Sequence, residues 1–469
     1  MKPSAQGNSK AAAHDSELVI AELPLRVAVR VWLRVAALSF GGPTGQIAVM
    51  HRILVEEKKW ISEHRFLHAL NYCMLLPGPE AQQLATYIGW LLHRTLGGLI
   101  AGTLFVLPGF AAILVLSILY AGYHNLTAVQ ALFFGLKPAV LAVVLEASMR
   151  IGKRALKNNL MIALACGSFI GIYFLELPFP LIILCAGTVG FLGGKYWQGK
   201  FLFNKNTANT NHEQEQSDAL IDNLPLTHTK PSLARALRIL AICLLLWFGP
   251  LLLLSLYFGS DSTFVQQGLF FSKVAVVTFG GAYSVLAYVA QQAVENFRWL
   301  APGEMLDGLG MAETTPGPLI MVLEFVGFLG AYRNPGGLHP MAAGTLAAIV
   351  TTWVTFVPCF LWIFLGAPYI ESLRSKRSLN GAMSAITAAV VGVVLNLAVW
   401  FALHTMFGQV SEIHSFGLRI FWPSWHTINI AAVVLTIAAV VSMFRYKTGM
   451  LPTLAGSATL GMIYYLLLR

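Results

Sequence analysis

The sequence predicts an all-α polytopic membrane protein that consists of two inverted repeats with broken Pro-Gly-Pro helices and about 13 spans, with a range of roughly 12–14. Three observations support this: an apolar composition, long apolar segments, and motifs that recur at a constant spacing. Of 469 residues, 57% are hydrophobic and 11% charged, against roughly half and a quarter in soluble domains. This composition excludes an ordinary soluble enzyme, a disordered chain and a nucleic-acid-binding module.

Apolar segments separated by short polar ones mark the predicted spans, because about 20 apolar residues cross a bilayer. These segments are 25–50, 66–93, 96–121, 127–149, 158–175, 179–194, 239–258, 264–289, 304–331, 344–368, 378–404, 427–443 and 449–468. Two of them, 66–93 and 304–331, contain Pro-Gly-Pro. We interpret both as broken crossings, and the sequence leaves re-entrant hairpins open as the alternative.

Basic residues predict the orientation, because Lys and Arg collect in cytoplasmic loops. They cluster at 150–157, around the polar linker 198–238, at 374–377 and at 445–447. With a cytoplasmic N-terminal segment, residues 1–24, all four clusters lie on the cytoplasmic side. The net charge of +10 then reflects membrane topology and requires no acidic partner. Residues 1–24 lack the apolar stretch of a cleavable signal peptide.

No cofactor, metal site or enzymatic activity is expected from the sequence. The cysteines lie singly in apolar segments, without a CxxC pair or zinc spacing; they are Cys73, Cys166, Cys185, Cys243 and Cys359. No dinucleotide-binding or phosphate-binding glycine motif accompanies them.

An internal repeat is the most informative feature. At an offset of 239 residues, the following pairs match: Phe40-Gly41-Gly42 with Phe279-Gly280-Gly281, Trp60 with Trp299, Pro77-Gly78-Pro79 with Pro316-Gly317-Pro318, and Arg34 with Lys273. Further along the offset becomes 250, so that Pro108 matches Pro358. We predict a duplication with repeats at 25–197 and 264–469. The segment 239–258 has no counterpart, and as a single crossing it inverts the second repeat, which is typical of secondary transporters.

The broken helices predict a central anion site. Pro-Gly-Pro ends one helix and suits the start of the next, and helix N-termini attract anions. The predicted substrate-binding residues are Arg34, Gly41, Gly42, Thr44, Pro77, Gly78, Pro79, Gln83, Lys273, Gly280, Gly281, Thr315, Pro316, Gly317 and Pro318. Two helix ends supply only about +1, and in this interpretation Arg34 and Lys273 add the remaining positive charge that a divalent anion needs.

Alternative interpretations exist for several of these residues. The glycine pairs equally suit close helix packing. Arg34 and Lys273 suit snorkelling to the membrane surface. Ionisable residues inside a membrane are costly and therefore candidates for function, and on that ground Glu80 and Glu313 are proton-coupling candidates.

These motifs resemble the chromate ion transporter family. The resemblance rests on Ser39-Phe-Gly-Gly-Pro-Thr-Gly45, the Trp60 segment, Leu76-Pro-Gly-Pro-Glu-Ala-Gln82 and their second-half counterparts, and it is closest to the long, two-domain type. It implies a secondary transporter, with suggested links to sulfate and the proton gradient, that exports chromate across the bacterial inner membrane and confers chromate resistance. It carries over to Gly41, Gly42, Trp60, Pro77, Gly78, Pro79 and their partners. In the second half Ala282-Tyr283 replaces Pro43-Thr44 and Leu319 replaces Glu80, so the half-sites are not equivalent.

The expected partners are chromate and the lipid bilayer, with sulfate as a competitor or counter-ion and no nucleic acid; a homodimer is left open. Two alternatives remain. One is a sulfate- or molybdate-type oxyanion transporter of the same architecture, because these ions share charge and shape with chromate. The other is a membrane chromate reductase, for which the sequence contains no redox-cofactor motif.

Overall fold

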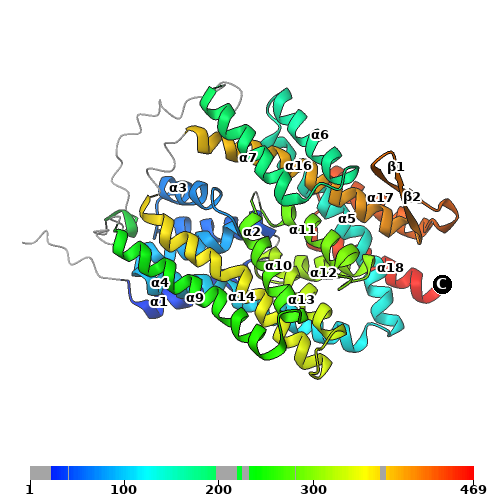
Figure 1. The fold of residues 1–469 in the computed structure, drawn as a ribbon, viewed down its shortest axis with the longest axis horizontal. Coiled ribbons are helices and arrows are strands. Elements are labelled where there is room, and N and C mark those ends of the chain that lie inside the picture. Colours follow the sequence, from blue (N-terminus) through cyan, green and yellow to red (C-terminus); the bar gives the residue numbers. More distant parts are fainter. Residues whose placement is uncertain are drawn as a thin grey trace, which may run out of the picture.

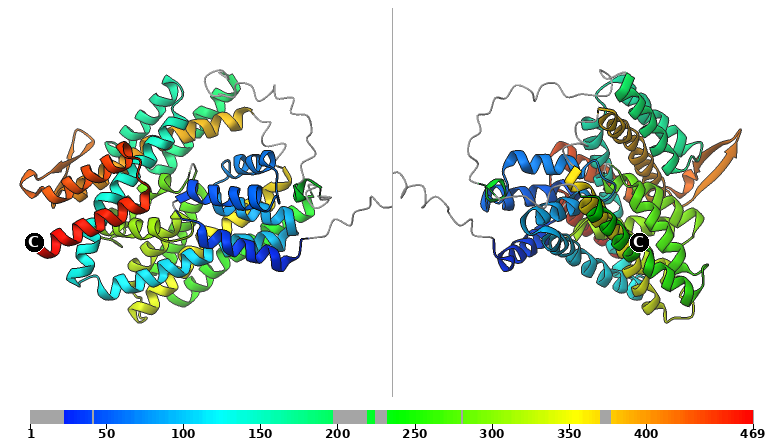
Figure 2. Two further views of the ribbon diagram at one scale, coloured as in Figure 1. Left: turned by 180° about the vertical axis from the view of Figure 1, so that it is seen from behind. Right: turned by 60° about the vertical axis from the view of Figure 1, so that its left-hand side comes forward.

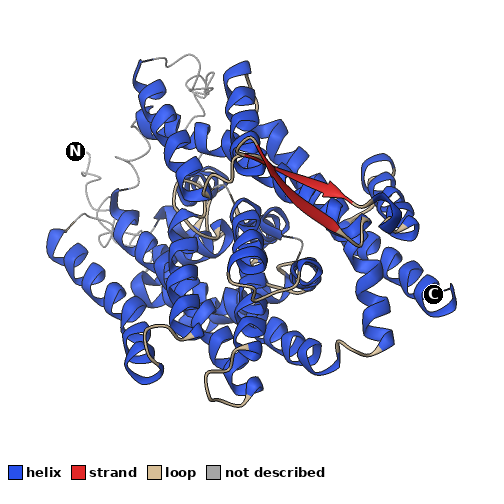
Figure 3. Cartoon of the chain, turned by 45° about the vertical axis from the view of Figure 1, so that its right-hand side comes forward, coloured by secondary structure: helices blue, strands red, loops and turns tan. Residues whose placement is uncertain are grey.

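The computed structural model describes residues 23–40, 42–196, 219–223, 232–279, 281–369 and 377–468. Most of the predicted cytoplasmic segment 1–24 and linker 198–238, together with Gly41, Gly280 and the basic residues at 374–376, lie outside the described residues. The prediction of an all-α polytopic protein is confirmed (Figures 1 and 3). The exception in the described part is a β-hairpin, β1 (Val410–Ser415) and β2 (Leu418–Pro423), which was not predicted from the sequence.

The helices follow the predicted apolar segments. In the first half they are α1 (Leu25–Leu38), α2 (Gly42–His51), α3 (Glu63–Cys73), α4 (Glu80–Tyr123), α5 (Thr127–Ala155), α6 (Asn159–Tyr173) and α7 (Phe179–Tyr196). The connecting helix is α9 (Leu233–Phe258). In the second half they are α10 (Thr263–Val277), α11 (Ala282–Gln291), α12 (Pro302–Thr314), η5 (Leu319–Met321), α13 (Val322–Arg333), α14 (Pro340–Gly366), α16 (Arg377–Met406), α17 (Ile430–Arg445) and α18 (Met450–Leu468).

The chain is a multi-pass membrane protein. Within the described ranges, seven helices are long and apolar enough to cross a membrane, and α6, α10 and α17 are shorter apolar helices. Helix α9 shows the character of the surface most clearly: Leu245, Leu253 and Leu256 are 72%, 68% and 76% exposed. Exposed leucines along a helix this apolar are typical of contact with lipid chains.

The helices form two bundles, and each bundle draws on both halves of the sequence. The first bundle packs α1, α9, α10 and α13 around α4 and α14, and the second packs α6, α7, α17 and α18 around α5 and α16. The first lies on the left of Figure 1 and the second on the right and at the top, and the rear view in Figure 2 agrees. Glycines allow close helix packing inside the second bundle, as where Gly135 meets Gly461.

Helices break at both Phe-Gly-Gly motifs, as predicted. Helix α1 ends at Leu38 and α2 begins at Gly42, and α10 ends at Val277 while α11 begins at Ala282. Gly42 has φ +68° and Gly281 φ +97°. Positive φ favours glycine, because a Cβ atom would be strained there. The helix breaks are therefore present, and the role of the glycine pairs in facing a ligand stays a prediction.

The prediction that 304–331 is a broken crossing is wrong. Its two arms, α12 and α13, turn back on one another: Arg333, at the end of α13, forms an ion pair with Glu304, in the first turn of α12, with N–O 2.6 Å. Closer to the turn, Gly308 packs against Phe325. In a straight crossing the two ends of this segment would lie on opposite sides of the membrane.

The segment 66–93 also turns back. Tyr72 of α3 and Tyr87 of α4 have ring centroids 5.7 Å apart, although the Pro-Gly-Pro turn lies between them. The first part of α4 ends at His93 and Arg94, whose backbone is non-helical. Beyond this kink the chain reverses again, because Gly89 packs against Gly97. Both Pro-Gly-Pro segments are thus helical hairpins, and the predicted count of about 13 crossings is too high.

The lengths of the arms explain the reversal. Helix α3 has 11 residues and α12 has 13, which at 1.5 Å per residue gives about 17 and 20 Å. Neither covers the roughly 30 Å hydrocarbon core. A hairpin that enters and leaves on one side needs only to reach the middle.

Candidate substrate site

The two Pro-Gly-Pro turns contact the helix breaks of the opposite half. The Gly78 N–H donates to the Thr278 carbonyl at 2.8 Å, and the Gly317 N–H donates to the Ser39 carbonyl at 3.0 Å. Ser39 and Thr278 are themselves separated by 239 residues, the offset of the repeat. The two hydrogen bonds are therefore counterparts, and each joins the tip of one hairpin to the break in the other half.

The long helices α4 and α14 repeat this pattern. A Cβ at Gly317 would lie 2.8 Å from Gly109 Cα, and a Cβ at Gly78 would lie 2.8 Å from Cys359 Sγ. Gly109 and Cys359 are 250 residues apart, the second offset of the repeat. Gly78 and Gly317 have φ +118° and +106°. These glycines are required both by backbone conformation and by close approach.

Four helix N-termini gather around these contacts. Helices α2, α4 and α11 begin here, as does η5, which leads into α13. Helix α2 packs on α4, and α11 packs on η5. Each N-terminus acts as roughly +0.5 charge with free N–H donors, so four supply about +2, twice what two half-helices offer. The N–H groups of Gly78 and Gly317 already have carbonyl partners and are not available to a ligand in this conformation.

Buried amide side chains surround the turns. Gln83 Nε2 donates to the Pro77 carbonyl at 2.7 Å, and Gln46 Nε2 donates to the Gly317 carbonyl at 2.5 Å. Gln82 donates to Thr86 Oγ1, and its own Oε1 has no partner among the described residues. Gln83 and Gln46 therefore hold the two turns through hydrogen bonds to their backbone carbonyls.

Three other predicted residues, Glu313, Thr315 and Thr44, have different surroundings. Glu313 is 1% exposed and accepts a hydrogen bond from the Tyr283 hydroxyl, and its second oxygen has no partner among the described residues. Thr315 donates to the carbonyl of Met311, within its own helix. The hydroxyl proton of Thr315 is therefore already used in this conformation. Thr44, in the first turn of α2, is exposed.

Arg34 and Lys273 have other partners. Arg34 forms an ion pair with Glu57 at 2.6 Å, with about half of its side chain exposed. Lys273 is exposed, and its Nζ lies 6.0 Å from the centre of the Tyr288 ring. The expectation that these two residues supply charge at the turns is therefore not supported by their contacts.

Two arginines of α5 provide positive charge that was not predicted from the sequence. Arg150 interacts electrostatically with Glu313 and Tyr283, and Arg154 with Glu80. Arg150 also lies 3.6 Å from Glu146. Both arginines were expected to belong to a cytoplasmic cluster. The i, i+4 spacing of 146, 150 and 154, which places them on one helix face, was the signal that distinguishes them from Lys153 and Lys157.

The two halves contact the second bundle unequally. Helix α12 packs along α5, and α11 packs along α16. The corresponding pairs, α3 with α16 and α2 with α5, make at most marginal contact in the described part of the chain. The Arg419 side chain of β2 contacts Glu295 at 3.1 Å, in the π-helical turn that extends α11. Helices α11 and α12 of the second half are thus closed against the second bundle, whereas α2 and α3 of the first half are not.

Comparisons with known proteins agree with the motifs. The sequence profile of a family described as Chromate transporter matches residues 27–191 and 265–462. The chain is 26% identical to a chromate transport protein of Cupriavidus metallidurans, over 95% of this chain and 94% of that protein. It is 30% identical to a chromate transport protein of Pseudomonas aeruginosa, over 77% of each. A probable chromate transport protein of Synechococcus elongatus is 26% identical, over 87% of this chain and 94% of that protein. No solved structure matches the chain.

Proposed function

Because the chain belongs to the chromate transporter family, we propose that it is a secondary active transporter that exports chromate across the bacterial inner membrane and so confers chromate resistance. The observation that carries the proposal is the pair of crossed contacts, Gly78 with Thr278 and Gly317 with Ser39. Hairpin tips that meet between two halves of a membrane protein are suited to hold a substrate and to release it when the halves rearrange.

The proposed binding site lies between the hairpin tips and α5. Four helix N-termini contribute about +2, and Arg150 and Arg154 add two full charges, one of which Glu146 offsets. Once Glu80 or Glu313 is protonated, the remaining positive charge matches that of a divalent oxyanion. An arginine presents planar, paired donors that match oxyanion geometry. The proposed ligand-binding backbone is that of Gly42 and Gly281, joined by Gly78 and Gly317 when the halves rearrange and their hydrogen bonds to the Thr278 and Ser39 carbonyls break. Pro77, Pro79, Pro316 and Pro318 shape the turns, and Gln83 lies beside them. Gly41 and Gly280 belong to the same motifs and lie outside the described residues.

The proposed topology has nine crossings with a cytoplasmic N-terminus. The crossings are the second part of α4, then α5, α6, α7, α9, α14, α16, α17 and α18. The segments α1–α2, α3 with the first part of α4, α10–α11 and α12–α13 are four re-entrant hairpins. This arrangement leaves all four basic clusters cytoplasmic. Helix α9 then inverts the second repeat, 264–469, relative to the first, 25–197, with the linker 198–238 in the cytoplasm.

Alternating access follows from the unequal packing. In the proposed topology α11 and α12 lie on the outer side, where they pack on α16 and α5, and α2 and α3 lie on the cytoplasmic side. The conformation is then inward-facing, with the cytoplasmic path to the hairpin tips open. The outward-facing state would exchange these contacts: α3 would pack on α16 and α2 on α5. Because the two repeats can make equivalent contacts, the two conformations are expected to have similar free energies.

Glu80 and Glu313 are the proposed proton-coupling residues. Both lie beside a Pro-Gly-Pro turn and within electrostatic range of an α5 arginine. When ionised they compete with chromate for these arginines, and when protonated they release them. Protonation of these carboxylates and binding of chromate therefore favour one another, which links the two binding equilibria.

The test is uptake of radiolabelled chromate into inverted membrane vesicles. Uptake driven by an imposed gradient is expected to exceed that of vesicles without the protein and to collapse with a protonophore. Uptake equal to that of empty vesicles refutes the proposal. Competition by unlabelled sulfate or molybdate separates the alternative substrates, since a site that packs against a tetrahedral dianion discriminates poorly between such isosteres.

A further inference from the structure

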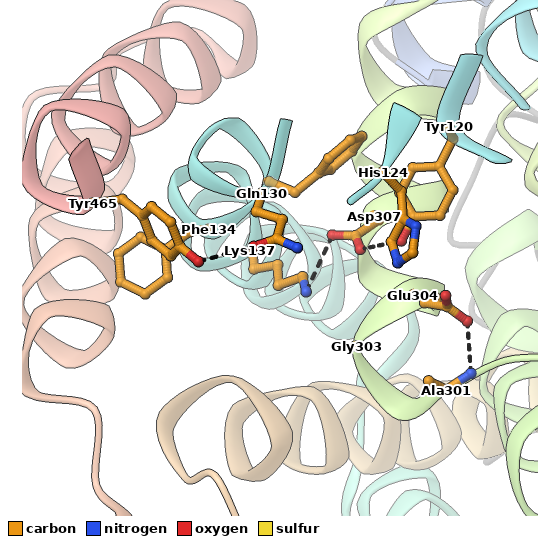
Figure 4. A pocket seen from close by; sticks show the side chains of 11 residues that line it. Tyr120, His124, Gln130, Phe134, Lys137, Ala301, Gly303, Glu304, Asp307 and Tyr465 are labelled. Atoms are coloured by element: carbon orange, nitrogen blue, oxygen red, sulfur yellow. Dashed lines mark hydrogen bonds and ion pairs between the residues drawn. The ribbon is translucent and has the colours of Figure 1, made fainter. Parts of the chain in front are cut away.

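A polar cavity lies away from the hairpin tips. It has a volume of about 350 Å³ and opens between the end of α4, α5, the start of α12 and α18. Figure 4 shows Lys137 and Asp307 facing one another across it. Its lining includes Tyr120, His124, Gln130, Lys137, Glu304, Asp307 and Tyr465. In the proposed topology this cavity opens to the outer side, because it is bounded by the α4–α5 connection and the start of α12.

Asp307 connects three elements at the base of this cavity. Its carboxylate is 3.3 Å from Lys137 Nζ of α5 and accepts a hydrogen bond from the Tyr120 hydroxyl of α4 at 2.9 Å. The Asp307 side chain is 4% exposed, and that of Lys137 is 28% exposed. A buried ionised carboxylate requires such partners. If Asp307 loses its charge, its electrostatic attraction to Lys137 is lost.

The other polar and charged groups that line the cavity near Asp307 have separate partners. Glu304, on the same helix, is bound by Arg333 of α13 at 2.6 and 2.8 Å. Tyr465 of α18 donates to Gln130 of α5 at 3.1 Å. The ring of His124, just after α4, is tilted against the Tyr120 ring, with centroids 5.5 Å apart. Lys137 is therefore the cation that Asp307 contacts among the described residues, and the pair is electrically balanced only while Asp307 is ionised.

The ion pair between Asp307 and Lys137 lies where it holds two helices together. It joins α12 to α5, the contact that closes the outer side in this conformation. Below it Gly310 packs on Val140 of the same two helices. Asp307 precedes Glu313 by six residues, about 9 Å along the helix axis. A change in the protonation of Asp307 therefore acts on α12, the short helix that ends at the Pro-Gly-Pro turn.

We propose that Asp307 and Lys137 form an outer proton-binding latch. A proton that enters the cavity from outside binds the Asp307 carboxylate and leaves it a neutral acid, while Lys137 stays an ammonium ion. The ion pair is lost, α12 separates from α5, and the outward-facing state becomes accessible. This inference rests on the proposed function, since it assigns a second proton site to the same transport cycle.

The experiment compares net transport with exchange in inverted vesicles, whose lumen corresponds to the outer side. Net chromate uptake driven by an acidic lumen and counterflow of labelled against unlabelled chromate are measured for the full-length protein and for Asp307→Asn. The amide cannot take up the proton, so net uptake is expected to fall about ten-fold or more, while counterflow stays within about two-fold. Asp261→Asn, at an exposed carboxylate in the loop before α10, is the matched control and should change neither.

A second variant tests the direction in which Lys137 shifts the pH dependence of net uptake. Lys137→Gln removes the charge that favours ionised Asp307, so the lumenal pH of half-maximal net uptake should rise by about one unit. His124→Gln should leave this pH unchanged. If net uptake by Asp307→Asn depends on lumenal pH as in the wild type, the proposed latch is wrong. It is also wrong if Asp307→Asn loses counterflow although it unfolds at the wild-type temperature. Failure of the proposed function looks different, because the unmodified protein then shows neither uptake nor counterflow.

Discussion

Gly109→Ala tests the close approach of α4 to the second Pro-Gly-Pro turn. Gly109 is inside a helix, so alanine imposes no backbone strain there. The new Cβ would lie 2.9 Å from the Pro316 carbonyl oxygen and 3.2 Å from Gly317 Cα. Ordinary contact begins near 3.4 Å, so the turn must move by about 0.5 Å (3.4 minus 2.9). Both neighbours are backbone atoms and cannot rotate away.

The expected change in the free energy of unfolding of Gly109→Ala is the difference of two effects. Overpacking of a dense site costs about 1–3 kcal/mol, and replacing a helical glycine by alanine returns about 0.5–1 kcal/mol. The free energy of unfolding should therefore fall by about 0–2.5 kcal/mol, with a central value of about 1 kcal/mol. Chromate uptake should fall more than this loss of stability explains, because the displaced turn carries the proposed binding backbone.

Gly167→Ala is the matched control, since Gly167 lies in the middle of α6 and no atom lies within 4 Å of the position that the new methyl group would occupy. It should be neutral or stabilising by about 0.5–1 kcal/mol, with normal uptake. The assay combines thermal unfolding in detergent with uptake into inverted vesicles. If Gly109→Ala matches Gly167→Ala in both measurements, the crossed packing described above is not tight and the reasoning is wrong.

Three further predictions concern the central charge, the outer closure and the buried acid. Arg150→Gln should lower chromate uptake by about ten-fold or more, whereas Lys153→Gln, on the same helix and exposed, should not; equal effects would contradict a role of Arg150 in binding. In a background without the native cysteines, a disulfide between Gly310→Cys and Val140→Cys should abolish uptake until it is reduced, because it holds α12 on α5. The pair Gly152→Cys and Val391→Cys, inside the second bundle, should not abolish it. Tyr283→Phe removes the hydrogen-bond donor of buried Glu313 and should lower the free energy of unfolding by about 1–3 kcal/mol; Tyr257→Phe, at an exposed tyrosine, should leave the unfolding temperature unchanged.

The hairpin tips show how far sequence reasoning reaches. Glycine and proline act through the local backbone, so the breaks at Gly42 and Gly281 and the turns at Gly78 and Gly317 could be predicted from the sequence. The repeat offsets also identified which positions are counterparts. Neither kind of signal says which turn contacts which break. The crossed hydrogen bonds join residues about 200–280 positions apart, and no local property specifies such a pairing.

Charge was harder to interpret than backbone. Arg34 and Lys273 were selected because they precede the breaks, yet Arg34 is bound by Glu57. Arg150 was assigned to a basic cluster because the rule for cytoplasmic loops uses composition alone. An arginine near a membrane surface and one that faces a site from a helix end have the same sequence signature. Only the packing of α5 against the hairpins distinguishes them.

The amino-acid sequence by itself determined the apolar helices, their breaks and their duplication, because each follows from hydrophobicity and from the backbone limits of glycine and proline. The tertiary structure decided that the short arms turn back, that the tips of opposite halves meet, and that Asp307 contacts Lys137. The physical reason is that an arm too short to cross the membrane has no fixed direction until neighbouring helices satisfy its polar ends.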